Sequence, residues 1–147
     1  MPLDENFRPE LIDHVGWRLW RLARQWKTEF EGEMQRRGYP WVAEARGGVI
    51  GHLRPGGRPQ SELAGLLGVS KQAVQQFVDE LVREGAVERV VDPRDARGRI
   101  VQLTRRGTAF LAEGNAVKRQ IEARYAGRIG RARLDALNRA LDDLAEE

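Results

Sequence analysis

Residues 59–107 carry the clearest structural pattern of the chain, and they read PQSELAGLLGVSKQAVQQFVDELVREGAVERVVDPRDARGRIVQLTRRG. From Ser61 to Leu67, leucine and alanine recur at the spacing of one helix face. Gly68-Val69-Ser70 follows as a tight turn, and Ser70 is a good N-cap for the next helix. Two short helices joined by such a turn form a helix-turn-helix.

The second helix of this pair has one apolar and one polar face. Its buried face is predicted from the i, i+3, i+4 and i+7 spacing of Val74, Phe77, Val78 and Leu81. The residues predicted to point outward are Gln72, Gln75, Gln76, Asp79 and Arg83. Gly85 is expected to end the helix.

A β-hairpin is predicted directly after this helix. Residues 87–91 and 99–103 are rich in β-branched side chains, and they flank a loop of proline, aspartate and glycine at residues 92–98. Thr104 is placed to cap a further helix. The segment therefore predicts a helix-turn-helix followed by a hairpin wing.

Further helices are predicted before this segment. Apolar residues recur every three or four positions from Glu10 to about Arg37, and Gly38-Tyr39-Pro40 ends the pattern. A shorter, glycine-rich helix is predicted from Val42 to Leu53. Pro59 suits the first turn of the helix that follows it.

Two helices are also predicted after the wing. One carries an apolar stripe of Phe110, Val117, Ile121 and Tyr125, and the other begins after Gly127 and Gly130. The last helix has leucines on one side, at positions 134, 137, 141 and 144.

Composition sets the broad class. The chain has 147 residues, 41% of them hydrophobic, which is enough for a folded core, and it has no cysteine for disulfides or thiolate metal sites. No segment approaches the roughly 18 consecutive apolar residues of a membrane span, and the start of the chain lacks an apolar signal core. We therefore expect a cytoplasmic protein without a membrane partner.

Positive charge is concentrated in one segment. The net charge is only +3, yet residues 89–106 hold six arginines and two aspartates, a local charge of +4. A basic segment on a nearly neutral chain indicates contact with a polyanion.

The outward face of the second helix has the chemistry of base recognition. An α-helix fits the DNA major groove, and its first turns reach the base edges. Gln72, Gln75 and Gln76 are placed for this, and a glutamine amide favours adenine. Lys71 is expected to meet a phosphate. The alternative is that these polar residues are only solvated.

The predicted hairpin loop, residues 92–98, has the chemistry of minor-groove binding. An arginine at a loop tip can enter the narrow, electronegative minor groove. The two aspartates of the loop are expected to hold its arginines through charge-assisted hydrogen bonds. The alternative is a surface turn with balanced charges.

Residues 61–107 resemble the MarR family of bacterial transcription regulators. The resemblance lies in the order of ELA, LGVS, a helix ending in L-x-x-x-G, a V-x-R strand, a D-x-R wing and L-T-x-x-G. It implies that Ser70 to Gln76 opens the recognition helix, that Asp95 orients the wing, and that Arg97 is the minor-groove arginine. Ala96 stands where many relatives are basic, and Arg94 and Arg99 are expected to compensate.

The resemblance also implies the whole architecture. The expected fold class is mainly α with a small β-hairpin wing, a winged helix-turn-helix domain with N- and C-terminal dimerisation helices. We expect a single MarR-like domain over residues 1–147, with the DNA-binding core at 42–107 and the helical dimerisation region at 8–37 and 108–147. The expected partners are a second copy of the chain and double-stranded DNA with a pseudo-palindromic site.

An effector site is expected in the aromatic N-terminal third. Its candidate residues are Trp17, Trp20, Trp41 and His52, beside an apolar pocket. The alternative is that these aromatic residues belong to the core or the dimer interface. With two histidines and no recognisable ligand spacing, we expect neither a metal nor another cofactor.

The expected function is that of a homodimeric DNA-binding transcription regulator, a repressor that a small lipophilic or aromatic effector releases. The alternative is a winged helix that serves as a protein-interaction or structural module without specific DNA reading. The sequence has no phosphate-binding glycine loop, nucleophile motif or metal cluster, so we do not expect an enzyme.

Overall fold

The computed structural model describes residues 6–43 and 45–145. Within them the fold is mainly helical with one small antiparallel sheet, as the sequence predicts. In chain order the elements are α1 (Val15–Arg36), the 3-10 helix η1 (Pro40–Ala43), α2 (Gly47–Gly51), β1 (Arg58–Pro59), α3 (Gln60–Leu67), α4 (Lys71–Arg83), β2 (Val87–Asp92), β3 (Asp95–Leu103), α5 (Arg105–Ile129) and α6 (Arg131–Leu144).

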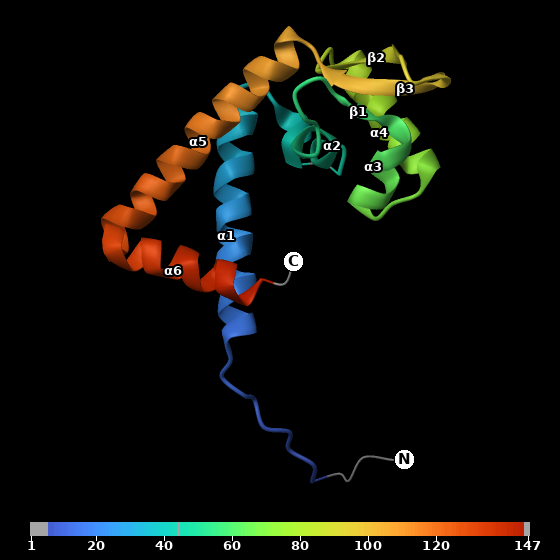
Figure 1. Ribbon diagram of the computed structural model, residues 1–147. Helices are drawn as coiled ribbons and strands as arrows, with labels where there is room; N and C mark the ends of the chain where they lie inside the picture. The colour runs from blue at the N-terminus through green and yellow to red at the C-terminus, as the bar shows by residue number, and fades with distance from the viewer. Residues whose placement is uncertain (1–5, 44, 146–147) are drawn as a thin grey trace.

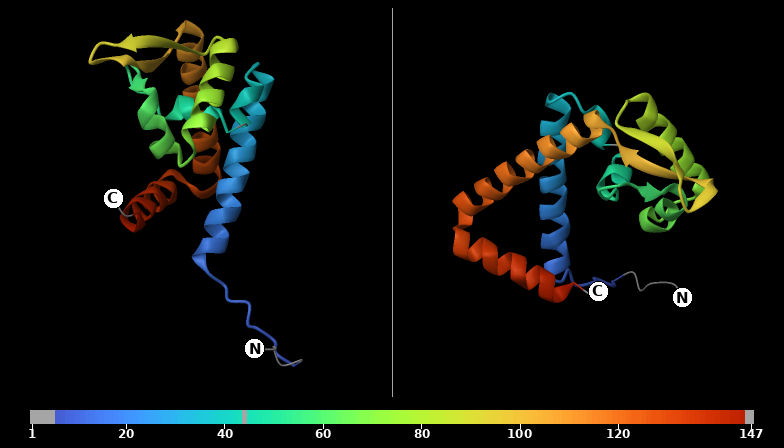
Figure 2. Two further views of the ribbon diagram at one scale, coloured as in Figure 1. Left: turned by 90° about the vertical axis from the view of Figure 1, so that its right-hand side faces the viewer. Right: turned by 45° about the horizontal axis from the view of Figure 1, so that its top comes forward.

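The long helices form one part of the molecule and the winged helix-turn-helix another. Helix α5 begins beside the C-terminal end of α1 and diverges from it, and α6 turns back, so that α1, α5 and α6 form three sides of a triangle (Figures 1 and 2). The sheet, α3 and α4 lie together beside one corner of this triangle. None of the helices in the described residues is long and apolar enough to span a bilayer.

The turn between α3 and α4 forms as predicted. Gly68 adopts the left-handed conformation, with φ of 67°, and the backbone N–H of Val69 donates to the carbonyl of Ala64 over 3.1 Å. Ser70 caps α4, because its Oγ accepts from the backbone N–H of Ala73 at 3.0 Å. The cap fixes the direction in which α4 leaves the turn.

The sheet has a strand that the sequence does not predict. Its order is β1-β3-β2, and the two-residue β1 pairs Arg58 with Val101 and Pro59 with Ile100. Pro59 is therefore the last extended residue before α3, with a ψ of 131°. The prediction that Pro59 lies in the first turn of this helix is wrong. Proline is tolerated here because β1 is an edge strand.

The wing is longer than predicted. We expected a loop over residues 92–98, but β3 begins at Asp95, so only Pro93 and Arg94 separate the strands. Val91 pairs with Arg99 and Asp92 with Asp95, so the register shifts and residues 96–98 bulge from the ladder. The stretch containing Arg97 is thus a bulge held between paired residues rather than a free loop.

A tight joint connects the winged part to α5. Thr104 caps α5 by accepting from the N–H of Gly107 at 3.1 Å, and its hydroxyl donates to the carbonyl of Gly85 at 2.5 Å. A Cβ on Gly107 would lie 2.0 Å from the carbonyl oxygen of Ala86, so only glycine fits. The end of α4 and the start of α5 are therefore fixed relative to each other.

Helix α1 starts later than predicted. It begins at Val15 and not Glu10, with His14 as N-cap, whose ring accepts from the N–H of Trp17. Leu11, in the predicted stripe, is 96% exposed in an extended segment. The reason is that periodicity alone does not stabilise a helix turn that has no core to pack on.

The core joins both parts of the molecule. The segment predicted as one helix at residues 42–53 is instead η1 and α2, and it buries Trp41, Val49 and Ile50. The other buried residues that share this cluster are Met34, Tyr39, Leu63, Val74, Val78, Leu81, Ala86, Val87, Val101, Phe110, Val117 and Ile121. Three of the four predicted core positions of α4 are fully buried, and Phe77 is partly buried.

Candidate nucleic-acid interface

A groove lies between the helix-turn-helix and the wing. Its volume is about 480 Å³, and α3, α4, β2 and β3 all contribute to it. Its lining residues are Pro59, Gln60, Ser61, Lys71, Val74, Gln75, Arg89, Asp92, Asp95, Arg97, Gly98 and Arg99. The structure therefore brings Lys71, Gln75, Asp95, Arg97 and Arg99, five of the predicted DNA-contacting residues, to one concave surface.

The first turn of α4 presents Lys71 and Gln72. Both side chains are exposed, and within the described residues the Gln72 amide has no hydrogen-bond partner. Ser70 differs, since its hydroxyl oxygen is used in the helix cap. Lys71 and Gln72 can therefore donate to an external ligand without breaking an internal contact.

Gln75 and Gln76 are exposed, but both form hydrogen bonds with other side chains of the protein. The amide of Gln76 donates to Glu80 one turn along α4 at 3.2 Å. Gln75 accepts from Gln60 at 2.7 Å and donates to Asp79 at 3.2 Å. The three glutamines that look equivalent in the sequence thus have different surroundings.

Arg89 and Gln60 are site residues that the sequence analysis did not single out. From β2, the Nε of Arg89 donates to Gln60 Oε1 at 2.9 Å, and its Nη2 lies 2.7 Å from Asp79 Oδ1. These contacts join residues from three elements, so local periodicity gives no sign of them. The only sequence signal was that Arg89 belongs to the basic segment.

The wing aspartates bind backbone and not guanidinium groups. Asp92 Oδ1 accepts from the N–H of Arg94 at 2.9 Å, and Asp95 Oδ1 accepts from the N–H of Arg97 at 3.0 Å. The predicted charge-assisted pairing with arginine side chains is therefore wrong for both. The carboxylates instead hold the shape of the turn and bulge, as aspartate does in Asx-turns.

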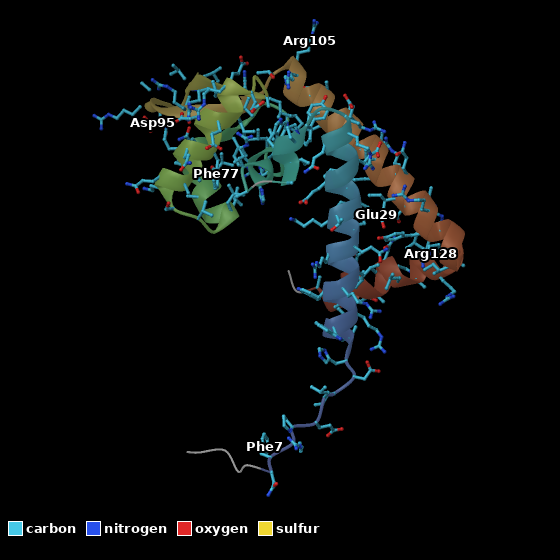
Figure 3. The ribbon with its side chains drawn as sticks, turned by 180° about the vertical axis from the view of Figure 1, so that it is seen from behind. Phe7, Glu29, Phe77, Asp95, Arg105 and Arg128 are labelled. Atoms are coloured by element: carbon cyan, nitrogen blue, oxygen red, sulfur yellow. The ribbon has the colours of Figure 1, made fainter. Side chains whose placement is uncertain are left out.

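Arg97 projects from the bulge into the groove. Within the described residues its guanidinium has no ion-pair or hydrogen-bond partner. Figure 3 shows Asp95, which fixes the backbone of Arg97, on the part of the wing farthest from α1. Removing the Arg97 side chain would therefore break no internal contact.

The other arginines of the basic segment divide into two groups. Arg99 lines the groove, and its Nη1 donates to the carbonyl of Gly98 at 3.0 Å, while Arg94 is exposed at the wing tip. Arg105 and Arg106 begin α5 and do not line the groove, and Figure 3 shows Arg105 pointing away from the winged part.

The four effector candidates do not come together. Trp17 and Trp20 stack at a ring distance of 5.3 Å near the start of α1, and they are 57% and 54% exposed. Trp41 lies beyond the C-terminal end of α1. At 1.5 Å per residue, the part of α1 from Trp20 to its end at Arg36 is already about 24 Å long. His52 is near Trp41 in the chain, and its Nδ1 donates to the Gly48 carbonyl at 2.7 Å.

Trp41 is a core residue. It is 0% exposed, and its ring packs against Phe110 at 4.5 Å and Tyr39 at 6.0 Å. The hydroxyl of Tyr39 donates to Glu113 at 2.8 Å; this bond, together with burial, raises the pKa of Tyr39. An effector could reach the Trp41 ring only by displacing this packing.

A different hollow lies among the long helices. It has a volume of about 250 Å³ between α1, α5 and α6. Its lining residues are Leu22, Gln25, Tyr125, Arg128, Ile129, Leu134 and Leu137. Burial raises the pKa of Tyr125, so the phenol stays protonated as a donor. Within the described residues, no cluster of histidine, aspartate and glutamate could hold a metal ion.

Comparison with known proteins agrees with this geometry. Residues 46–98 match the family model described as MarR family. No curated protein sequence matches significantly. The matched family consists of transcriptional regulators and not of enzymes, as expected from the sequence.

Solved structures with this fold cover nearly the whole chain. Apo MarR from E. coli superposes with a TM-score of 0.75 at 20% identity, covering 93% of this chain and 100% of that one. YusO from Bacillus subtilis gives a TM-score of 0.70 at 24% identity, covering 89% and 94%. A point mutant of S. aureus MepR, bound to an oligodeoxyribonucleotide, gives 0.64 at 15% identity, covering 90% and 96%.

The family match falls on the segment that forms α2, the helix-turn-helix and the first part of the wing, and the fold extends the likeness to the flanking helices. The sequence match over residues 46–98 and the shared architecture together show a winged helix-turn-helix fold similar to that of the MarR family.

Proposed function

We propose that the protein is a homodimeric DNA-binding transcription regulator in which α4 enters the major groove and the wing contacts the adjacent minor groove. The observation that carries this proposal is the groove between α4 and the wing. Lys71 and Arg97 line it, and Gln72 is exposed on the same helix turn as Lys71. Donors aimed at one concave surface suit the phosphates and base edges of a duplex.

Each of these side chains has a separate role in the proposal. Lys71 binds a phosphate, Gln72 reads a base in the major groove, and Arg97 enters the minor groove. Arg94 and Arg99 add positive charge along the wing. Gln76 donates one N–H to Glu80 and keeps its other N–H and its carbonyl oxygen for a base. The solved MepR relative is bound to an oligodeoxyribonucleotide, which supports DNA as the partner.

The proposed dimer interface lies on the long helices. The first half of α1 exposes an apolar surface formed by Val15, Trp17, Leu19, Trp20 and Leu22. Exposed apolar surface of this kind is costly in a monomer and marks an interaction site. A second copy related by a dyad would cover this apolar surface. The dimer would then present two α4 helices to a pseudo-palindrome with half-sites about 10 base pairs apart.

The division of the chain follows from this proposal. Residues 42–107 form the DNA-binding core, and residues 8–37 and 108–147 form the dimerisation region of a single MarR-like domain. A regulator that acts on the chromosome works in the cytoplasm of a bacterium.

We also propose that regulation is repression, released by a small lipophilic or aromatic effector. The apolar hollow between α1, α5 and α6 supports this, because Gln25, Tyr125 and Arg128 add polar groups to an apolar wall. Release requires that the effector bind better to a dimer whose α4 helices are wrongly spaced for DNA. This hollow replaces the region of Trp41 as the proposed effector site.

Salt dependence of DNA binding tests the proposal against the alternative of a protein-interaction module. The logarithm of the association constant for duplex DNA should fall linearly with the logarithm of salt concentration, with a slope of about −0.9 per neutralised phosphate. Fluorescence anisotropy with a labelled duplex measures this slope. No binding at low salt, or a flat response, would favour the interaction module.

A further inference from the structure

Four polar side chains form a closed hydrogen-bonded ring, and three of them, Gln60, Gln75 and Arg89, line the groove. The ring joins α3, α4 and β2 through Gln60, Gln75, Asp79 and Arg89. Its bonds run from Arg89 Nε to Gln60 Oε1 at 2.9 Å, from Gln60 Nε2 to Gln75 Oε1 at 2.7 Å, from Gln75 Nε2 to Asp79 Oδ1 at 3.2 Å, and from Arg89 Nη2 to Asp79 Oδ1 at 2.7 Å.

The two charged members give the ring a direction. A glutamine amide can turn over and exchange its donor and acceptor ends at little cost when it is free in water. Arginine only donates and ionised aspartate only accepts. Arg89 therefore requires the side-chain oxygen of Gln60. The NH2 group of Gln60 then faces the side-chain oxygen of Gln75, and the NH2 group of Gln75 faces the carboxylate of Asp79.

We propose that Gln60, Asp79 and Arg89 are positioning residues that fix the amide of Gln75 and thereby set the base that Gln75 reads. This inference rests on the proposed DNA-binding function. The ring uses one N–H and one lone pair of the Gln75 amide and leaves one of each. Adenine in the major groove needs this pair, a donor to its N7 and an acceptor for its N6 amino group.

Fixing the amide before DNA arrives improves selectivity. A free, exposed glutamine loses rotamer freedom when it binds, and it can satisfy several bases by turning its amide over. A glutamine held at both ends meets neither cost and presents one pattern. The base opposite Gln75 is thus selected by the whole ring and not by Gln75 alone.

The ring also permits a carboxylate close to the groove that is proposed to face DNA. Asp79 would repel nearby phosphates if it were unpaired. The guanidinium of Arg89 at 2.7 Å neutralises it. Arg89, one of the six arginines of the basic segment, is thus assigned to the protein's own Asp79 and not to a phosphate.

The free protein provides the first test, by NMR of side-chain N–H groups. In the wild type, the Nε–H of Arg89 and the amide of Gln75 should be protected from exchange with water. Gln60→Ala should remove the protection of the Arg89 Nε–H, whose acceptor is Gln60 Oε1, and Asp79→Ala should remove that of the Gln75 amide, whose acceptor is Asp79 Oδ1. The matched control is Gln102→Ala, which breaks a similar 2.6 Å bond between Gln102 and Glu88 outside the groove. An unchanged Arg89 signal in Gln60→Ala, or an unchanged Gln75 signal in Asp79→Ala, would overturn the ring.

Selection of DNA from a random pool provides the second test. Gln60→Ala should reduce discrimination at one position of each half-site by about fivefold or more, because a well-placed base contact is worth that much. The salt slope should stay unchanged. Asp79→Asn, which removes the acceptor-only end, should have the same effect on the same position, and in a Gln75→Ala background neither substitution should change the motif further.

The outcomes separate the ring from the proposed function. A Gln60→Ala motif identical to that of the wild type overturns the positioning role while DNA reading stands. A uniform loss of affinity across all sequences shows instead that Gln60 binds DNA itself, which also overturns it. If the wild type enriches no sequence, the proposed function fails, while the NMR test still decides whether the ring exists.

Discussion

Replacing Arg97 with alanine should weaken DNA binding strongly without affecting the fold. The guanidinium lies in the groove and has no partner within the described residues, and Asp95 holds the backbone N–H of Arg97, which alanine retains. The bulge should therefore keep its shape. Surface substitutions that break no internal contact change stability by about 0.5 kcal/mol or less.

The size of the effect follows from the number of copies. A lost arginine contact to DNA costs about 1–3 kcal/mol, so each half-site loses roughly tenfold at 1.4 kcal/mol. A dimer loses two such contacts, and the dissociation constant should rise about a hundredfold. If each guanidinium displaces one counterion, the salt slope should also become shallower by about 1.8.

Anisotropy titrations of a selected duplex at several salt concentrations measure both quantities. The matched control is Arg105→Ala, which removes an exposed arginine of the same segment outside the groove. The control should change the dissociation constant by less than about threefold, since distant charges are screened at physiological salt. Thermal unfolding should give the same midpoint for all three proteins within about 2 °C.

Two results would contradict the proposed role of Arg97. Unchanged affinity in Arg97→Ala would show that the wing does not contact DNA. Equal losses in Arg97→Ala and Arg105→Ala would show that binding depends on overall charge and not on the groove.

Three further predictions concern other parts of the molecule. Gln72→Ala removes an amide that has no hydrogen-bond partner in the part of the chain that the structure describes; it should relax base preference at one half-site position in a selected-site experiment, and an unchanged motif would argue against base reading. Trp20→Glu, which places a charge on the exposed apolar surface of α1, should raise the dimer dissociation constant at least tenfold in analytical ultracentrifugation, whereas an unaltered dimer would place the interface elsewhere. Trp41→Ala should lower the free energy of unfolding by about 3–5 kcal/mol in urea titrations, because it empties a fully buried site, and a small change would contradict its assignment to the core.

Most of the fold could be predicted because local signals decide it. The cap of Ser70, the left-handed turn at Gly68 and the spacing of Val74, Val78 and Leu81 act within a few residues. The errors arise where tertiary contacts decide. Helix α1 begins at Val15, because the turns predicted before it have no core to pack on. The edge strand at Pro59 forms because β3 lies beside it and pairs with it.

The candidate site was predictable in outline but not in its internal bonding. The sequence indicates that Gln72 and Arg97 are exposed, and they are. It does not indicate that Gln75 is held by Gln60, because the two residues come from different helices and their contact depends on the packing of α3 against α4. The same holds for the aspartates of the wing, whose backbone bonds depend on a bulge that the pattern does not predict.

Selection of bound duplexes from a random pool by the wild-type protein decides whether the chain reads DNA as a symmetric dimer. We expect an enriched pseudo-palindrome with half-sites about 10 base pairs apart and A·T pairs at the positions that Gln72 and Gln75 reach. Enrichment of no sequence, or of a single site without dyad symmetry, would contradict this expectation.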